Sequence, residues 1–197
     1  MNRDRTWATL AIVGLCALQV GCPPGSPGDT VKDPMTTTND CTAALRALAS
    51  GDYAPWHGLT DDCTTAHAVA AFGHQEGADR TGDLGGSPTR YRIYPATAAA
   101  PHGIYVWDVN DRIVLLRLHE VAATQPIRDQ LGEPEARELS KMPGFKTQWV
   151  YASRGLTLHV DDETGAIAFL YAYRPMTVNE FRASWLSRVE IRRTPAF

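Results

Sequence analysis

Apolar and polar residues alternate in short runs over most of the chain beyond residue 85, and this pattern predicts β-strands. Other segments have helical spacing, and each stops at a glycine, which suits the left-handed conformation after a helix. These helices are expected over residues 40–49, 61–72 and 124–131, with stops at Gly51, Gly73 and Gly132. Asn39 is the expected cap of the first helix, and Asp61 with Asp62 caps the second.

The elements after residue 60 are predicted to form two units of the same order, each a helix followed by three strands. The strands are expected over 89–94, 103–107 and 113–118 in the first unit, and over 147–151, 155–160 and 166–173 in the second. Turns rich in Asp, Asn and Gly separate the paired runs. We therefore expect an α+β fold of two tandem helix-plus-three-stranded antiparallel meander units, with the helices on one face of the sheet.

The first unit, with its extra N-terminal helix, is expected over residues 39–120, and the second over 121–197. The second unit ends in a helix that Thr177 and Glu180 open as a capping box. This helix is expected to reach about Ser187 and to pack Phe181 and Trp185 on the sheet, because the two residues share one helix face.

The start of the chain has the pattern of a signal peptide over residues 1–21. Arg3 and Arg5 precede an uncharged run over residues 7–20, which is shorter than the roughly 20 residues that a membrane-spanning helix needs. Residues 19–22, Gln-Val-Gly-Cys, resemble the lipobox of bacterial lipoproteins, although Gln19 departs from its leucine. The resemblance implies cleavage before Cys22 and a lipid such as palmitate on that cysteine; ordinary secretion or use of Cys16 are the alternatives.

Residues 22–38 are rich in Pro, Gly and Thr and predict a flexible tether to a membrane. Pro23 stands where an aspartate retains such lipoproteins at the inner membrane, which favours the outer membrane of the cell envelope. The formal net charge of −3 lacks the basic footprint that nucleic acid requires, so no nucleic-acid partner is expected.

Two cysteines remain after the leader and the lipidated position, namely Cys41 and Cys63. An oxidising compartment favours a disulfide between them. Two buried free thiols are the alternative, and a zinc site is disfavoured because the two cysteines lack the close spacing of zinc ligands.

Two short motifs carry a resemblance to known families. Residues 131–134, Leu-Gly-Glu-Pro, and 149–151, Trp-Val-Tyr, resemble the BamE/SmpA outer-membrane lipoproteins. The doubled unit looks like the β-lactamase inhibitor protein family, although the first unit has Phe72-Gly73-His74-Gln75 without the proline. The resemblance implies docking to other proteins and no more than that class of function.

One sheet face is predicted to carry aromatic and basic side chains, since aliphatic residues alternate with them along the strands. Ile93 and Val150 are expected on the side under the helices. The residues expected on the other, partner-binding face are Arg92, Tyr94, Tyr105, Trp107, Arg117, Trp149, Tyr151, His159 and Tyr171. Such side chains dominate protein interfaces, so we expect a protein partner or a cell-envelope ligand. Burial of these residues under the C-terminal helix is the alternative.

Catalytic and metal motifs are missing from the sequence. The six histidines include no His-Glu-x-x-His pattern, and His159 with Asp161 and Asp162 is better explained by a hairpin turn. No cofactor is expected. The predicted function is a membrane-anchored, extracytoplasmic, non-catalytic protein-binding or envelope-assembly module. The alternatives are a small periplasmic hydrolase using His57 or His119 with Glu120, and a structural envelope protein without a discrete ligand.

Overall fold

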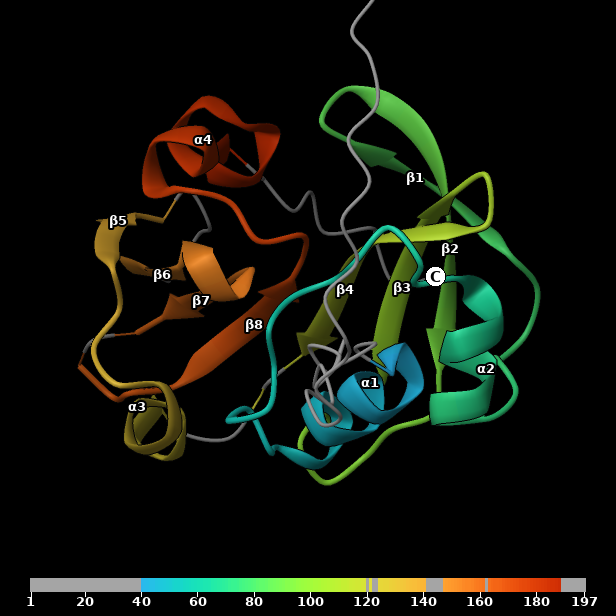
Figure 1. Cartoon of the computed structure of the whole chain (residues 1–197), viewed down its shortest axis with the longest axis horizontal. Coiled ribbons are helices and arrows are strands. Elements are labelled where there is room, and N and C mark those ends of the chain that lie inside the picture. Colours follow the sequence, from blue (N-terminus) through green and yellow to red (C-terminus); the bar gives the residue numbers. More distant parts are fainter. Residues whose placement is uncertain (1–39, 120, 122–123, 141–146, 162, 189–197) are drawn as a thin grey trace, which may run out of the picture. The chain divides into compact units, whose positions relative to one another are not determined.

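A computed structural model describes residues 40–119, 121, 124–140, 147–161 and 163–188. Within these residues the protein has an α+β fold with four α-helices and one eight-stranded antiparallel sheet (Figure 1). The predicted signal peptide, Cys22, the tether and the tail over 189–197 lie outside the described residues, as do Asn39, Glu120 and Asp162.

The helices are α1 (Cys41–Ser50), α2 (Thr65–Phe72), α3 (Thr124–Leu131) and α4 (Val178–Ala183). The strands are β1 (Arg80–Leu84), β2 (Ser87–Tyr94), β3 (Ile104–Val109), β4 (Arg112–His119), β5 (Ala136–Leu139), β6 (Thr147–Tyr151), β7 (Leu156–Val160) and β8 (Ile167–Ala172). Two 3₁₀ turns, η1 (Ala152–Arg154) and η2 (Trp185–Arg188), complete the described elements.

The strand order in the sheet is β1-β2-β3-β4-β8-β7-β6-β5. Strands β4 and β8 pair at the centre and join the β1–β4 and β5–β8 halves, with Arg117 directly opposite Tyr171. The prediction of three strands after each helix is wrong, because α2 and α3 are each followed by four. The missed strands β1 and β5 form the two edges of the sheet, where exposed polar residues hide the apolar alternation that marks an interior strand.

The helix ends follow local hydrogen bonding. Asp40 caps α1 by accepting from the backbone of Thr42 and Ala43, and Gly51 ends it at φ 84°. The predicted start of the second helix at Asp61 is wrong: α2 begins only at Thr65, after Thr64, whose backbone N–H donates to Nδ1 of His67. The capping chemistry therefore lies with Thr64 and His67 and not with the two aspartates.

The turn between β3 and β4 was predicted from its Asp and Asn residues, and its backbone explains the choice. Asn110 and Asp111 have φ values of 51° and 68°. Two successive residues in the left-handed region form the hairpin turn whose twist matches that of paired strands, and Asn and Asp tolerate that region better than other side chains.

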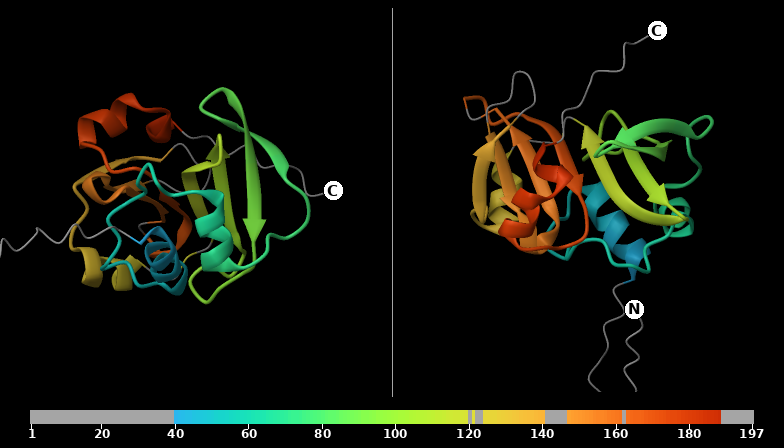
Figure 2. Two further views of the ribbon diagram at one scale, coloured as in Figure 1. Left: turned by 45° about the vertical axis from the view of Figure 1, so that its right-hand side comes forward. Right: turned by 90° about the horizontal axis from the view of Figure 1, so that it is seen from above.

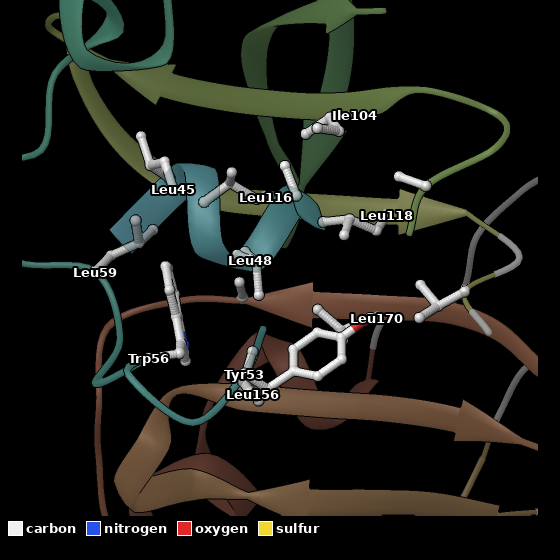
Figure 3. Close-up of a cluster of buried hydrophobic side chains, with 14 of the residues drawn as sticks. Leu45, Leu48, Tyr53, Trp56, Leu59, Ile104, Leu116, Leu118, Leu156 and Leu170 are labelled. Atoms are coloured by element: carbon white, nitrogen blue, oxygen red, sulfur yellow. The ribbon is translucent and has the colours of Figure 1, made fainter. Parts of the chain in front are cut away.

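One face of the sheet carries the main hydrophobic core, with α1, α2 and α3 packed on it. Helix α1 lies between the two halves of the sheet (Figure 2). Its Leu45 and Leu48 are fully buried between Leu116 of β4 and Leu156 of β7 (Figure 3). The sulfur atoms of Cys41 and Cys63 lie 2.01 Å apart, in agreement with the predicted pair, so a disulfide joins the start of α1 to the segment before α2.

The opposite face of the sheet carries a second cluster, which α4 and η2 cover in part. The predicted capping box is present, since the N–H of Thr177 donates to Oε2 of Glu180 at 2.7 Å. Phe181 of α4 is fully buried on this face. The expectation that all helices lie on one face is therefore wrong for α4, which also stops at Ala183 rather than near Ser187. In the part of the chain described here, no helix combines the length and the apolar character needed to cross a membrane.

Candidate binding face on the sheet

Cross-strand register defines the residues that share the face opposite α1, α2 and α3, because directly opposed side chains point to the same side of a sheet. Arg117 of β4 faces Tyr105 on one side and Tyr171 on the other. His119 faces Phe169, which in turn faces His159. With the pair of Tyr91 and Trp107, these positions form the aromatic face, which consists of Tyr91, Tyr105, Trp107, Arg117, His119, His159, Phe169 and Tyr171.

The predicted partner-binding residues divide between the two sides of the sheet. Five lie on the aromatic face, namely Tyr105, Trp107, Arg117, His159 and Tyr171. The placement of the other four is wrong: Arg92, Tyr94, Trp149 and Tyr151 pair with core aliphatics of the helix side. Tyr94, for example, opposes Ile104, and Tyr151 opposes Leu156.

The error has a physical reason, which is that both sides of the sheet are covered near β6. Val150 is expected on the helix side because it is aliphatic. In the structure it is fully buried on the opposite face, in the cluster that includes Phe181 of α4. Tyr151 is a core residue whose hydroxyl donates to the carbonyl of Gly132 at 3.0 Å. A tyrosine with such a partner is as suited to the interior as a valine, so side-chain type alone does not determine which way a strand faces.

Three members of the aromatic face were missed from the sequence: Tyr91, His119 and Phe169. Phe169 and Tyr171 are two positions apart on one strand, so alternation from Tyr171 is a signal for Phe169. His119 is found the same way from Arg117 on β4. Tyr91 lies on β2 and was missed because Arg92 and Tyr94, its neighbours in the alternation, were expected on this face instead.

The rings of the aromatic face form a continuous stack across the centre of the sheet. Tyr91 stacks on Trp107 with ring centres 5.2 Å apart, and Tyr105 stacks on His119 at 4.4 Å. His119 meets Phe169 edge-on at 4.5 Å. These separations are those of favourable aromatic pairs, so the stack holds the side chains in fixed positions.

The guanidinium of Arg117 lies within this stack. Its central carbon is 4.6 Å from the ring centre of Tyr105, 5.0 Å from that of Trp107 and 5.3 Å from that of Phe169. A cation at these distances over a ring is attracted by the ring's electron density. No carboxylate of the described residues lies within ion-pair distance of Arg117.

Exposure varies along the aromatic face. Trp107, His159 and Tyr171 are buried, with Trp107 and Tyr171 in the cluster that α4 and η2 share. The other five members, from Tyr91 to Phe169, are half-buried. The alternative of burial under the C-terminal helix therefore holds for one part of the face, while the rings of Tyr91, Tyr105 and Phe169 remain partly exposed.

Two histidines of the aromatic face are held neutral. Burial first, and the nearby charges of Arg117 and His102 second, lower the pKa of His119 to about 3. Burial lowers the pKa of His159 to about 4. Both rings are therefore uncharged near pH 7, and Arg117 is the permanent cation of the face.

Several buried polar atoms on this face make no hydrogen bond within the described structure. They are Nε1 of Trp107, Nε of Arg117, Nε2 of His119, Oε1 of Gln148 and the hydroxyl of Tyr171. Buried polar groups are normally paired, because an unpaired one costs about 1 to 3 kcal/mol. The helix side has such atoms as well, namely Nε1 of Trp56, the hydroxyl of Tyr94 and Nε of Arg128, so unpaired atoms alone do not mark the aromatic face as incomplete.

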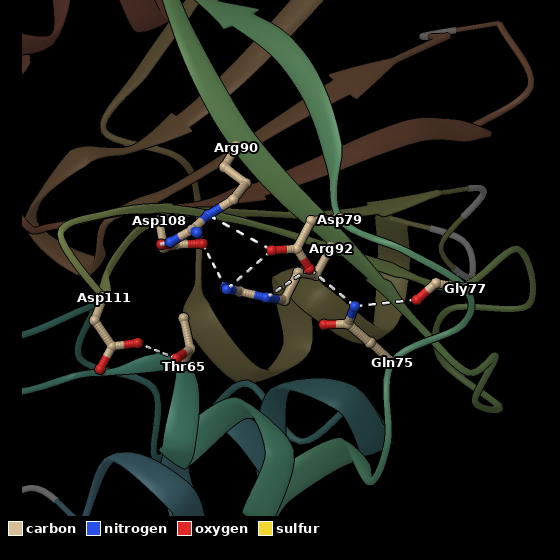
Figure 4. A network of polar contacts seen from close by, with 8 residues as sticks. All are labelled: Thr65, Gln75, Gly77, Asp79, Arg90, Arg92, Asp108 and Asp111. Carbon is tan, nitrogen blue, oxygen red and sulfur yellow. Dashed lines mark hydrogen bonds and ion pairs between the residues drawn. The ribbon is translucent and has the colours of Figure 1, made fainter.

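The helix side treats its polar groups differently. The side chain of Asp108 is fully buried and forms ion pairs with Arg90 and Arg92, and Arg92 also pairs with Asp79 at 3.2 Å (Figure 4). Gln75 donates to Asp79 at 2.9 Å, which extends the network towards α2. The predicted binding residue Arg92 therefore belongs to an internal network and is 13% exposed.

In the described part of the chain, a serine and a histidine meet at Ser140 and His159, with Oγ 2.8 Å from Nδ1. The amide nitrogen of Gln148 lies 3.3 Å from Nε2 of the same ring. If that amide donates to Nε2, Nδ1 carries the proton and donates to Ser140, which leaves no base to activate the serine. His57 contacts a guanidinium nitrogen of Arg154 at 3.1 Å, and no carboxylate of the described residues pairs with it. Among the described residues, no group of three or more His, Cys, Asp or Glu could hold a metal ion.

Comparison with known proteins gives little beyond this geometry. No protein-family model matches the chain, and no curated protein matches it. A crystal structure of a DUF4309 family protein (YjgB) from Bacillus subtilis is similar at a TM-score of 0.41 and 18% identity. The match covers 68% of this chain and 95% of that chain.

Proposed function

We propose that the chain is a lipoprotein of the bacterial cell envelope, anchored through lipid on Cys22, and that its folded part is a non-catalytic binding module. The sequence of residues 1–22 supports export and lipidation, and its Pro23 favours the outer membrane. The disulfide between Cys41 and Cys63 is consistent with an oxidising compartment outside the cytoplasm. The ligand is a protein partner or another component of the envelope.

The observation that carries the binding function is the aromatic face. Its rings are stacked on one another, and four of them are partly exposed. Rigid aromatic side chains with a polar handle are typical of the energetic centre of an interface. A structural envelope protein without a ligand would instead be expected to have a polar open face.

We also propose that the sheet is built from two related units, α2 with β1–β4 and α3 with β5–β8. The same element order in both halves and the central pairing of the two last strands, β4 and β8, support this relation. The likeness to BamE/SmpA lipoproteins and to β-lactamase inhibitor proteins remains a proposal on the motifs at residues 131–134 and 149–151. A crystal structure in which the two units fail to superpose would contradict the relation between them.

The binding function is tested with a double substitution of half-buried rings, Tyr105→Ala with Phe169→Ala. Full-length protein is crosslinked to its neighbours in intact membranes, and crosslinked products are compared with those of the parent. We expect the products to be lost while the protein still folds cooperatively. Leu139→Ala is the matched control, because Leu139 is an apolar side chain 85% exposed on β5, away from the aromatic face. Unchanged products in the double variant would contradict the proposal.

The anchor is tested by metabolic labelling with a fatty-acid analogue. The parent chain and a Cys16→Ala control are expected to be labelled equally, while Cys22→Ala is expected to lose the label. A Cys22→Ala chain labelled as strongly as the parent would contradict lipidation at this residue.

A further inference from the structure

Arg117 of β4 differs from Arg92 of β2 in the groups that surround its guanidinium. Arg92 is 13% exposed and binds two carboxylates, whereas Arg117 is half-buried among rings with no acceptor of opposite charge in the described structure. Burying a guanidinium without a counter-ion is unfavourable, and its attraction to the rings offsets only part of this cost. A carboxylate ligand would complete the site.

The shape of the guanidinium points to the same kind of ligand. A carboxylate fits the planar fork of a guanidinium with two parallel hydrogen bonds.

The number of charges favours a protein over a polyanion. A membrane surface or a nucleic acid presents many phosphates, and its partners bind through several cations. Here His119 and His159 are neutral near pH 7, and the whole chain has a formal net charge of −3. One cation surrounded by apolar rings fits one carboxylate surrounded by apolar side chains.

We propose that the aromatic face binds an acidic segment of a partner protein, with one Asp or Glu carboxylate on the guanidinium of Arg117. Apolar side chains that flank this carboxylate lie on the rings of Tyr105 and Phe169. The inference rests on the proposed binding function and specifies its ligand.

The probe is an array of short peptides in which each Asp- or Glu-containing peptide has a twin with Asn or Gln at the acidic position. The full chain, purified in detergent, is expected to bind a subset of acidic peptides that combine the acid with apolar neighbours. The amide twins are expected to bind about 30-fold more weakly, since removing one partner of a buried charge pair costs at least this factor.

Variants assign this preference to its residue. Arg117→Met is expected to bind acidic and amide peptides equally, whereas Arg117→Lys keeps a weaker preference because an ammonium lacks the planar fork. Arg112→Met is the matched control, because Arg112 is an exposed arginine on the same strand, and it is expected to keep the parent's preference. Thermal unfolding of each variant confirms that it is folded at the temperature of binding.

The outcomes separate this inference from the binding function itself. In one outcome, the parent binds acidic peptides and their amide twins equally, and the Tyr105→Ala and Phe169→Ala double variant binds neither. This result overturns the carboxylate inference but keeps the binding face. Binding that survives the double variant overturns both. An array without bound peptides, or binding only to a neutral oligosaccharide such as chitotetraose, also overturns the inference.

Discussion

Arg92 and Arg117 lie on strands that flank β3, yet on opposite faces of the sheet, and they differ in what surrounds them. On the helix side, Arg92 contacts Asp79 and the fully buried Asp108, so its charge is balanced inside the chain. On the aromatic face, Arg117 contacts rings and pairs with no carboxylate of the described residues. The charge of Arg92 is thus balanced by carboxylates of the described residues, whereas that of Arg117 is not. Substitutions on the first should change stability, and substitutions on the second should change binding.

The largest effect on stability is expected for Asp108→Asn. The change removes a buried negative charge that two arginines share, and breaking a buried pair costs about 3 to 5 kcal/mol of unfolding free energy. Urea denaturation measures the loss. Asp52→Asn is the control, because Asp52 is an exposed carboxylate shortly after the end of α1. This change should alter the unfolding free energy by less than about 0.5 kcal/mol. An Asp108→Asn chain as stable as the parent would remove the contrast between the two faces.

The disulfide of the helix side is expected to contribute about 3 kcal/mol. It closes a loop between residues 22 positions apart, and this restricts the unfolded chain. Replacing Cys41 and Cys63 together by alanine should lower the unfolding free energy by that amount without changing peptide binding at the aromatic face. A loss of binding in a variant that is still folded would mean that the two faces are coupled.

His159 sharpens the comparison, because it lies on the aromatic face but its ring is paired with Ser140 and Gln148. Its pKa is about 4 in the folded chain and near 6.5 in the unfolded chain, so the unfolded chain binds the extra proton between these values. Its contribution is therefore fully present above about pH 6.5 and is lost as the pH falls towards 4, by about 3 kcal/mol. His159→Gln should flatten the stability profile over this range. An unchanged profile would contradict the neutral, structural role of this histidine.

The smallest effect on stability is expected for Arg117→Met. Only ring contacts and the cross-strand pairs with Tyr105 and Tyr171 are lost, which together are worth about 1 kcal/mol. Calorimetric unfolding measures this difference against the parent. A loss as large as that of Asp108→Asn would mean that Arg117 is a structural residue like Arg92.

Much of the fold follows from local signals in the sequence. Gly51 and Gly132 mark the ends of α1 and α3, Asn110 with Asp111 marks a hairpin, and Thr177 with Glu180 marks the start of α4. These features act within a few residues of chain, so they are visible without tertiary structure. The edge strands β1 and β5 were missed because neither has a buried apolar side, so their sequences lack the alternation that predicts a strand.

The candidate site was only partly predictable, because it depends on which way each strand faces. On β3 and β4 the aliphatic residues alternate cleanly with Tyr105 and Arg117, and the prediction was right. On β2 and β6 both faces are buried in places, so Tyr94 and Tyr151 were taken for the open side. The surroundings of Arg117 on β4 depend on rings from β3 and β8, and these contacts have no sequence signal.

The central claim is that the aromatic face, and not the helix side, meets a partner in the cell envelope. The most direct test is photo-crosslinking in living cells from a benzoyl-phenylalanine placed at position 105, compared with the same probe at Val69, which is 42% exposed on α2. We predict a discrete crosslinked species from position 105 that is lost when Arg117→Met is added, and none from position 69. The same species from both positions, or from position 69 alone, would contradict the account.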